Sequence, residues 1–117
     1  MTIGEFSEKT NISCSALRYY EDKGLIRVER DFGNRRIYSE KDIEWVKFLQ
    51  RLKNTGMKLK DMKRYSDLRY KGKSTMAERL EILQKHRLFI DEQMQMWAEY
   101  SQNLNDKILW YKENLSK

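Results

Sequence analysis

Proline is absent from this sequence of 117 residues, and cysteine and histidine occur once each, as Cys14 and His86. With no proline and only five glycines, the chain favours helices with short connections over a β-rich or disordered structure. A lone cysteine forms no internal disulfide, and it lacks the companion ligands of a structural zinc site. The histidine has no nucleophile, glycine-rich phosphate loop or metal ligands near it, so we expect neither an enzyme nor a cofactor nor a bound metal.

Long apolar runs are also missing. No stretch of about 18 apolar residues occurs and the chain starts with polar residues, so the sequence predicts neither a transmembrane span nor a secretory signal. We therefore expect a cytoplasmic protein with no membrane partner. With 39% hydrophobic and 36% charged residues, the chain can build one small core with an extension rather than two independent cores.

Positive charge is concentrated in the N-terminal part of the chain. Residues 1–75 contain 18 Lys and Arg against 11 Asp and Glu, a net charge of +7, whereas residues 76–117 contain 6 against 7, a net charge of −1. A basic compact module with a near-neutral tail suits phosphate binding at one end of the chain. A basic surface that binds no partner would have the same charge. The motifs therefore have to decide between a phosphate-binding surface and a merely basic one.

Two short helices are predicted at the N-terminus. Thr2 with Glu5 has the pattern of a capping box, which predicts a helix that begins there and ends about two turns later. Ser13 is the expected N-cap of a second helix that runs to about Lys23 and stops at Gly24. A short turn between two such helices predicts a helix-turn-helix, whose second helix has a small, basic and aromatic face that suits a DNA groove.

The pattern changes from helical to alternating after the second helix. Residues 26–30 and 35–38 alternate as strands do, and residues 31–34 contain the turn formers that join them. This predicts a β-hairpin wing. Its cations are poorly suited to a core but well suited to phosphates: Arg30, Arg35 and Arg36 beside Tyr38.

Two further helices are predicted before the tail. Ser39 with Asp42 indicates the start of a third helix, which ends at Gly56. A fourth helix follows over about residues 59–68 with a second basic surface on its outer side. That surface contains Lys58, Lys60, Lys63 and Arg64. Residues 71–74 are the expected linker, and Thr75 with Glu78 is the expected cap of the last helix.

The clearest periodicity lies in the tail, where twelve positions alternate spacings of four and three residues and only Arg87 and Ser101 break the apolar set. These seam positions are Met76, Leu80, Leu83, Arg87, Ile90, Met94, Trp97, Ser101, Leu104, Ile108, Tyr111 and Leu115. A narrow seam sustained this long predicts a coiled coil, most simply a homodimer. We therefore expect a mainly α protein, with a winged helix-turn-helix DNA-binding domain at residues 1–73 and a long coiled-coil dimerisation helix at residues 74–117.

Three stretches resemble one known family. LRYYEDKGLI at residues 17–26, NRRIY at residues 34–38 and Asp42-Ile43 match, in order and spacing, the MerR family of bacterial transcriptional regulators. The resemblance covers residues 1–75 in detail, and the helical tail agrees in position and kind. It implies a dimer joined by an antiparallel coiled coil, which binds a palindromic operator in double-stranded promoter DNA. It also implies that the regulator twists and bends this DNA so that RNA polymerase can use the promoter.

The resemblance also implies which residues contact DNA. Tyr20 matches one of these positions, but its spacing with Leu17 fits a core role at least equally well. Lys58 stands where a Ser or Thr N-cap is usual, so it loses a cap and gains a phosphate donor. The implied recognition-helix contacts are Ser15, Arg18, Tyr19 and Tyr20, the wing contacts are Arg35, Arg36 and Tyr38, and the contacts of a second wing are Lys58 and Lys60.

The tail is similar to the short-tailed branch of the family, which includes aldehyde-responsive and thiol-stress regulators. Residues 70–117 contain no cysteine, which argues against metal sensing. Aldehyde-responsive relatives use a cysteine near the position of Arg51, which this chain lacks. Cys14 is either an unreactive filler or a thiol whose modification disturbs DNA binding. A small-molecule effector of unknown identity, bound between head and tail, stays an open alternative.

Two other functions fit part of the sequence. An architectural DNA-binding protein of the excisionase type shares the small winged head without needing an effector, but it does not need a long dimer helix. A coiled-coil adaptor with no role on DNA would leave Arg18 and Arg36 as dispensable surface charges.

Overall fold

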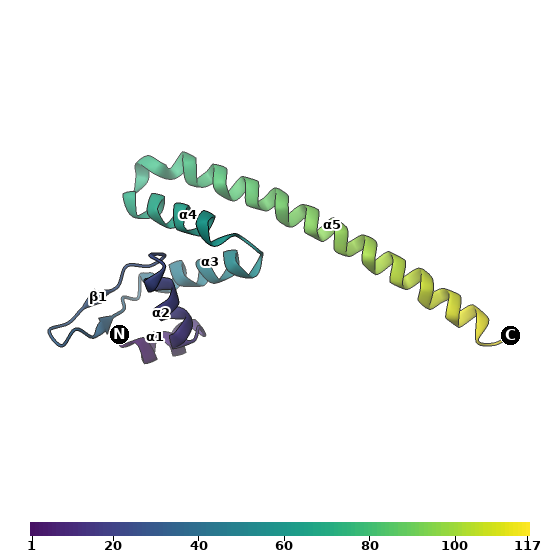
Figure 1. Cartoon of the computed structure of the whole chain (residues 1–117), viewed down its shortest axis with the longest axis horizontal. Helices are drawn as coiled ribbons and strands as arrows, with labels where there is room; N and C mark the ends of the chain where they lie inside the picture. Colours follow the sequence, from purple (N-terminus) through teal and green to yellow (C-terminus); the bar gives the residue numbers. More distant parts are fainter. The chain divides into compact units, whose positions relative to one another are not determined.

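The computed structural model describes all 117 residues, which form a mostly helical chain with one small hairpin (Figure 1). In chain order the elements are α1 (Ile3–Thr10), α2 (Cys14–Asp22), β1 (Glu29–Arg30), β2 (Arg36–Ile37), α3 (Asp42–Asn54), α4 (Leu59–Lys71), a short 3-10 turn at Lys73–Thr75, and α5 (Met76–Asn114). The chain divides into two compact units, Met1–Ile82 and Leu83–Lys117. The predicted mainly helical fold with a two-stranded wing and a long last helix is confirmed.

Local capping signals fix the helix-turn-helix. The Thr2 hydroxyl accepts a hydrogen bond from the Glu5 amide at 3.1 Å, and the Glu5 carboxylate accepts one from the Thr2 amide at 3.3 Å, so the predicted capping box is present. The hydrogen bond from the Thr2 backbone lowers the pKa of Glu5. The Ser13 hydroxyl accepts from the Ala16 amide at 3.1 Å and starts α2. Gly24 has a φ of 72°, the left-handed conformation expected just after a helix end.

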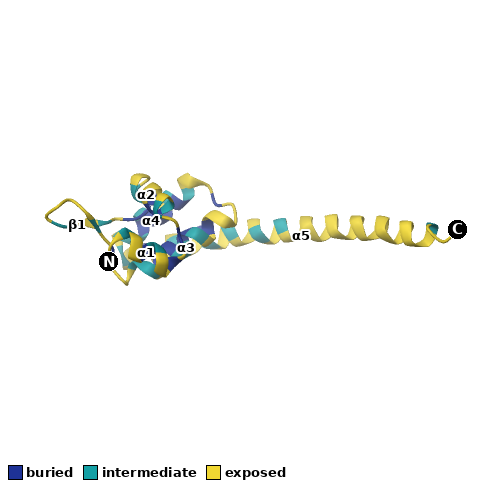
Figure 2. Ribbon diagram, turned by 90° about the horizontal axis from the view of Figure 1, so that it is seen from below, coloured by how far each residue is buried: buried dark blue, intermediate teal, exposed yellow.

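The core of the first unit lies among α1, α2, α3 and α4, where the buried residues of Figure 2 gather. Phe6, Leu17 and Tyr20 are fully buried in it. The Leu25 carbonyl accepts hydrogen bonds from Trp45 Nε1 at 3.2 Å and from the Ser66 hydroxyl at 2.6 Å, which ties α3 and α4 to the segment after α2. Helix α2 itself packs against α1, and its buried Tyr20 donates to the Gln50 side chain of α3, so the inner face of α2 is held from behind.

Two predicted caps are wrong. Helix α3 begins at Asp42 with Lys41 as N-cap, because the Ser39 carbonyl accepts from the Asp42 amide at 3.0 Å in a turn that precedes the helix. Before α5, the Thr75 hydroxyl lies 2.6 Å from the Leu68 carbonyl and 2.8 Å from the Gly72 carbonyl, and it accepts from Arg79 Nε. Thr75 is therefore a buried tie between α4 and the 3-10 turn rather than half of a capping box with Glu78.

Helix α5 has 39 residues and only one of them, Ile82, is buried in the single chain. Most of its predicted seam is exposed, apart from the half-buried Leu83 and Ile90: the exposed fraction is 64% at Met94, 68% at Trp97, 64% at Leu104 and 80% at Leu115. None of the helices is long and apolar enough to cross a membrane. A long helix that exposes tryptophan, leucine and methionine in one periodic stripe presents a surface suited to another helix.

Candidate nucleic-acid interface

Helix α2 separates its side chains cleanly into an inner and an outer face. Leu17 and Tyr20 are fully buried, whereas Ser15, Arg18 and Tyr19 are exposed. This follows from the helical period, because residues three apart share a face and their neighbours point elsewhere. Arg18 makes no hydrogen bond or ion pair within the chain, so its guanidinium keeps all its donors for a partner. The structure thus brings three of the predicted contact residues together on one exposed surface.

Cations surround the exposed tyrosine of this face. The ammonium groups of Lys23 and Lys53 lie 5.7 Å and 5.8 Å from the centre of the Tyr19 ring. The neighbouring Tyr20 behaves differently, since its hydroxyl donates to the side-chain oxygen of Gln50, and burial raises its pKa. Tyr19 is therefore available to a ligand, while Tyr20 fixes α2 against α3.

The wing is a short antiparallel hairpin in which Glu29 pairs with Ile37 and Arg30 pairs with Arg36. Its tip is closed by Asp31, whose carboxylate accepts from the Gly33 amide at 2.9 Å, the Arg35 amide at 3.0 Å and Arg35 Nε at 3.1 Å. The backbone hydrogen bond from Arg35 lowers the pKa of Asp31. The side chain of Arg35 is 81% exposed, so this predicted contact residue lies open at the tip.

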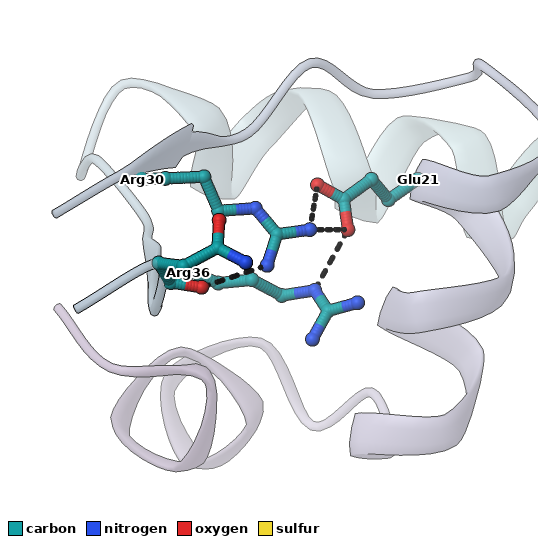
Figure 3. Close-up of polar contacts among 4 residues, drawn as sticks. Glu21, Arg30 and Arg36 are labelled. Atoms are coloured by element: carbon teal, nitrogen blue, oxygen red, sulfur yellow. Dashed lines mark hydrogen bonds and ion pairs between the residues drawn. The ribbon is translucent and has the colours of Figure 1, made fainter. Parts of the chain in front are cut away.

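One carboxylate of α2 holds both strands of the wing (Figure 3). Arg30 Nη2 lies 3.0 Å and 3.2 Å from the two oxygens of Glu21, and Arg36 Nε donates to Glu21 at 2.7 Å. Arg36 therefore uses its inner nitrogen on Glu21 and keeps its two Nη groups without a partner in the chain. Sequence reasoning missed Glu21. The available signal was an acid in the last turn of α2, followed by an arginine-rich hairpin.

Tyr38 lies in the core rather than on the surface. It is 3% exposed and its ring stacks on Phe6 with ring centres 4.5 Å apart. The Met1 amino group donates to the Tyr38 carbonyl at 2.7 Å, and the Tyr38 amide donates to the Met1 carbonyl at 2.8 Å. Its hydroxyl is buried without a hydrogen-bond partner, and burial followed by the charge of Glu21 raises its pKa. In the free protein neither Tyr20 nor Tyr38 offers a surface to DNA.

Lys58 and Lys60 stand at the start of α4 and are both exposed. Lys58 occupies the N-cap position without a side-chain hydrogen bond, as its residue type predicts. The helix start therefore combines two ammonium groups with amides that no side chain caps, and this favours an anion.

A helix-turn-helix followed by a hairpin wing, with exposed basic side chains on both, defines a DNA-binding head of the winged type. The chain belongs to the MerR family: the model of MerR HTH family regulatory proteins matches residues 1–68, and a second model, described as MerR, DNA binding, matches residues 43–106. It is a DNA-binding transcriptional regulator.

Known proteins resemble this chain along nearly its whole length. An HTH-type transcriptional regulator of Haemophilus influenzae is 38% identical over 114 residues, which cover 96% of this chain and 84% of the relative. Among solved structures, HiNmlR, a MerR family regulator lacking the sensor domain and bound to promoter DNA, has a TM-score of 0.84 at 34% identity, with 98% of this chain and 92% of that chain covered. A MerR family regulator from Listeria monocytogenes has a TM-score of 0.91 at 29% identity, with 98% and 88% covered.

These relatives are transcriptional regulators and not enzymes. The likeness to a regulator that lacks a sensor domain supports the short-tailed form predicted from the sequence.

Proposed function

We propose that this protein binds a palindromic promoter operator as a homodimer and controls transcription by distorting the DNA spacer for RNA polymerase in the cytoplasm. The observation that carries the proposal is the open basic face shared by α2 and the wing, where Arg18 is exposed and Arg36 is bound to Glu21 through Nε alone (Figure 3). The promoter DNA bound to the similar regulator HiNmlR supports DNA as the partner. The functional division that goes with this is a DNA-binding domain at residues 1–73 and a dimerisation helix at residues 74–117.

The proposed contact residues bind different parts of the DNA. Ser15, Arg18 and Tyr19 on the outer face of α2 would enter the major groove, where a guanidinium can bind a base edge with two hydrogen bonds. Arg35 and Arg36 on the wing would bind phosphates, which fixes the register of the head on the duplex. Lys58 and Lys60 would hold a further phosphate at the start of α4. The structure favours a supporting role for Tyr20 and Tyr38, which pack behind these residues.

The exposed seam of α5 supports a homodimer. Burying one leucine or isoleucine side chain stabilises a protein by about 1.5–3 kcal/mol, and the seam repeats such residues along the whole helix. A second copy offers the matching stripe, and the family resemblance implies an antiparallel arrangement. Two heads at a fixed separation then select a palindrome and favour a duplex deformed to fit both heads.

The first test compares Arg18→Ala and Arg36→Ala with the wild type on a duplex recovered from a random DNA pool by the wild-type protein. Each loss should weaken binding by about 1–3 kcal/mol. Arg18→Ala should also relax the preference for individual bases, whereas Arg36→Ala should reduce the salt dependence by about one ion and leave the identity of the preferred bases unchanged.

Lys112→Ala, which removes the same charge from the tail, is the matched control and should bind as the wild type does. Equal affinities for all four proteins, or a pool from which no duplex is enriched, would contradict the proposed function and favour an adaptor that does not bind DNA.

A further inference from the structure

A phenylalanine occupies the tip of the wing, where it packs against nothing. The exposed fraction of Phe32 is 112%, higher than that of any other large apolar residue in the chain. Both views show the hairpin reaching away from the helices of the first unit (Figures 1 and 2). Removing a fully exposed aromatic ring from water is favourable, so a ring in this position would add affinity for a partner that covers it.

The turn that carries this ring is ordered by its own hydrogen bonds. The Asp31 carboxylate accepts from two backbone amides of the tip, and the Asn34 amide donates to the Asp31 carbonyl at 3.0 Å. Asn34 adopts a left-handed φ of 60°, and its carbonyl accepts from Arg30 Nη1 at 3.2 Å. The position of the backbone under Phe32 is therefore set before any ligand arrives, and binding does not have to order a loose loop.

The surroundings of the ring fit a nucleic acid groove. Arg30 and Arg35 flank Phe32 in sequence, and Arg35 is largely exposed. The Arg30 guanidinium is held by Glu21 and the Asn34 carbonyl, so Arg35 is the open cation of the tip, and a cation close to an apolar ring matches a phosphate close to sugars and bases. A helix in the major groove also leaves the adjacent minor groove within reach of a segment that extends from the same domain.

We propose that Phe32 is an apolar wedge that enters the minor groove beside the one occupied by α2 and partly unstacks a base step. Phenylalanine is one of the residues that act in this way, and such insertion kinks a duplex by roughly 20–90°. The inference rests on the proposed function and adds a contact that deforms the duplex: the wing tip of each protomer would unstack one base step beside its half-site.

The test compares Phe32→Ser, Phe32→Leu and the wild type on a duplex of about 30 base pairs, long enough for two half-sites and their flanks. The duplex is the one enriched by the wild-type protein, with 2-aminopurine placed at successive flanking positions to report unstacking and end labels to report bending. Ile37→Ser, which removes a 42% exposed apolar side chain from the strand of the same wing, is the matched control.

Phe32→Ser should lower affinity by roughly tenfold or more, as expected for losing a buried phenylalanine contact. It should also abolish the 2-aminopurine signal and reduce the bend, while the salt dependence stays that of the wild type because no phosphate contact is lost. Phe32→Leu keeps an apolar wedge and should keep most of the signal. Both Phe32 variants should melt as the wild type does, since the ring makes no packing contact.

The inference is overturned if Phe32→Ser binds and bends the duplex as the wild type does. It is also overturned if the variant binds and bends the free duplex as the wild type does and only its binding to the duplex in the presence of RNA polymerase changes, because the ring would then contact a protein. Failure of the proposed function gives different results: no duplex is enriched, or Arg18→Ala binds as the wild type does. In either case the inference about Phe32 is also rejected.

Discussion

Replacing Glu21 with glutamine should loosen the wing without unfolding the head. The Glu21 carboxylate accepts from Arg30 on one strand and from Arg36 on the other, so it is the contact through which α2 holds both strands. Glutamine keeps the shape of the side chain but removes its charge, and its amide nitrogen can only donate toward a guanidinium that also donates. Two cations would then share one neutral acceptor.

The size of the effect follows from how far these groups are buried. The side chains of Glu21, Arg36 and Arg30 are 18%, 28% and 37% exposed. Exposed ion pairs contribute about 0–1 kcal/mol and hydrogen bonds to charged groups about 1.5–3 kcal/mol. For this half-buried cluster we expect a loss of about 1–2 kcal/mol, which raises the population of undocked wings by about 5–30-fold.

The consequence for DNA binding has two opposite parts. Removing a negative charge from a basic face strengthens binding to any duplex. An undocked wing weakens binding to the operator, because Arg36 is no longer held where a phosphate can meet it. The ratio of operator affinity to random-duplex affinity should therefore fall, even if the affinity for random DNA rises.

The assay is fluorescence anisotropy with the enriched duplex and a random duplex, together with trypsin cleavage at the wing arginines, which should be faster in Glu21→Gln. Glu40→Gln is the matched control, because it changes the net charge equally but the Glu40 carboxylate, 79% exposed, contacts Lys9 at 3.5 Å and neither of these wing arginines. If both variants show the same affinity ratio and the same cleavage rate, Glu21 does not hold the wing and the reasoning fails.

Two further predictions concern the core and the tail. Tyr38→Phe removes a buried hydroxyl that has no partner, so urea unfolding should show a gain of about 1 kcal/mol; a loss would mean that the hydroxyl has a partner. Because burial raises the pKa of Tyr38, the stability from its neutral form is present below the ordinary pKa of 10.0 and is lost as pH rises through the folded value, so the variant should also resist alkali better. Trp97→Lys should lower the dimer affinity measured by sedimentation by at least about tenfold, because it places a charge in the seam, whereas Glu99→Lys outside the seam should leave the dimer intact. A monomeric wild type would contradict the dimer and favour an architectural protein of the excisionase type.

Local chemistry explains which parts of the fold were predictable. The caps at Thr2 and Ser13 and the left-handed Gly24 depend on residues within one turn of each other, and the sequence displays all of them. The start of α3 was not predicted because two local patterns compete at Ser39. Its hydroxyl accepts from the Lys41 amide at 3.4 Å and its carbonyl from the Asp42 amide at 3.0 Å, so Ser39 opens a turn and the helix begins at Asp42.

The site residues also divide into those that a local pattern predicts and those that depend on contacts between elements. Helical period alone places Arg18 outside and Leu17 inside, and the structure agrees. The burial of Tyr38 comes from Phe6, and the role of Glu21 comes from arginines 9 and 15 positions later in the chain, so no periodic pattern displays either of them. Contacts between elements decide these roles. A sequence motif therefore predicts them only where the proteins that share the motif also share those contacts.

Arg36 shows why charge alone does not describe this site. Its guanidinium donates through Nε to Glu21 while both Nη groups stay open, so one side chain is fixed on one edge and available on the other. A lysine carries the same charge on a single ammonium at the end of a flexible stem, and it cannot hold Glu21 and present a separate rigid fork to a phosphate. The requirement at this position is therefore for the geometry of arginine, and Glu21 is the residue that makes use of it.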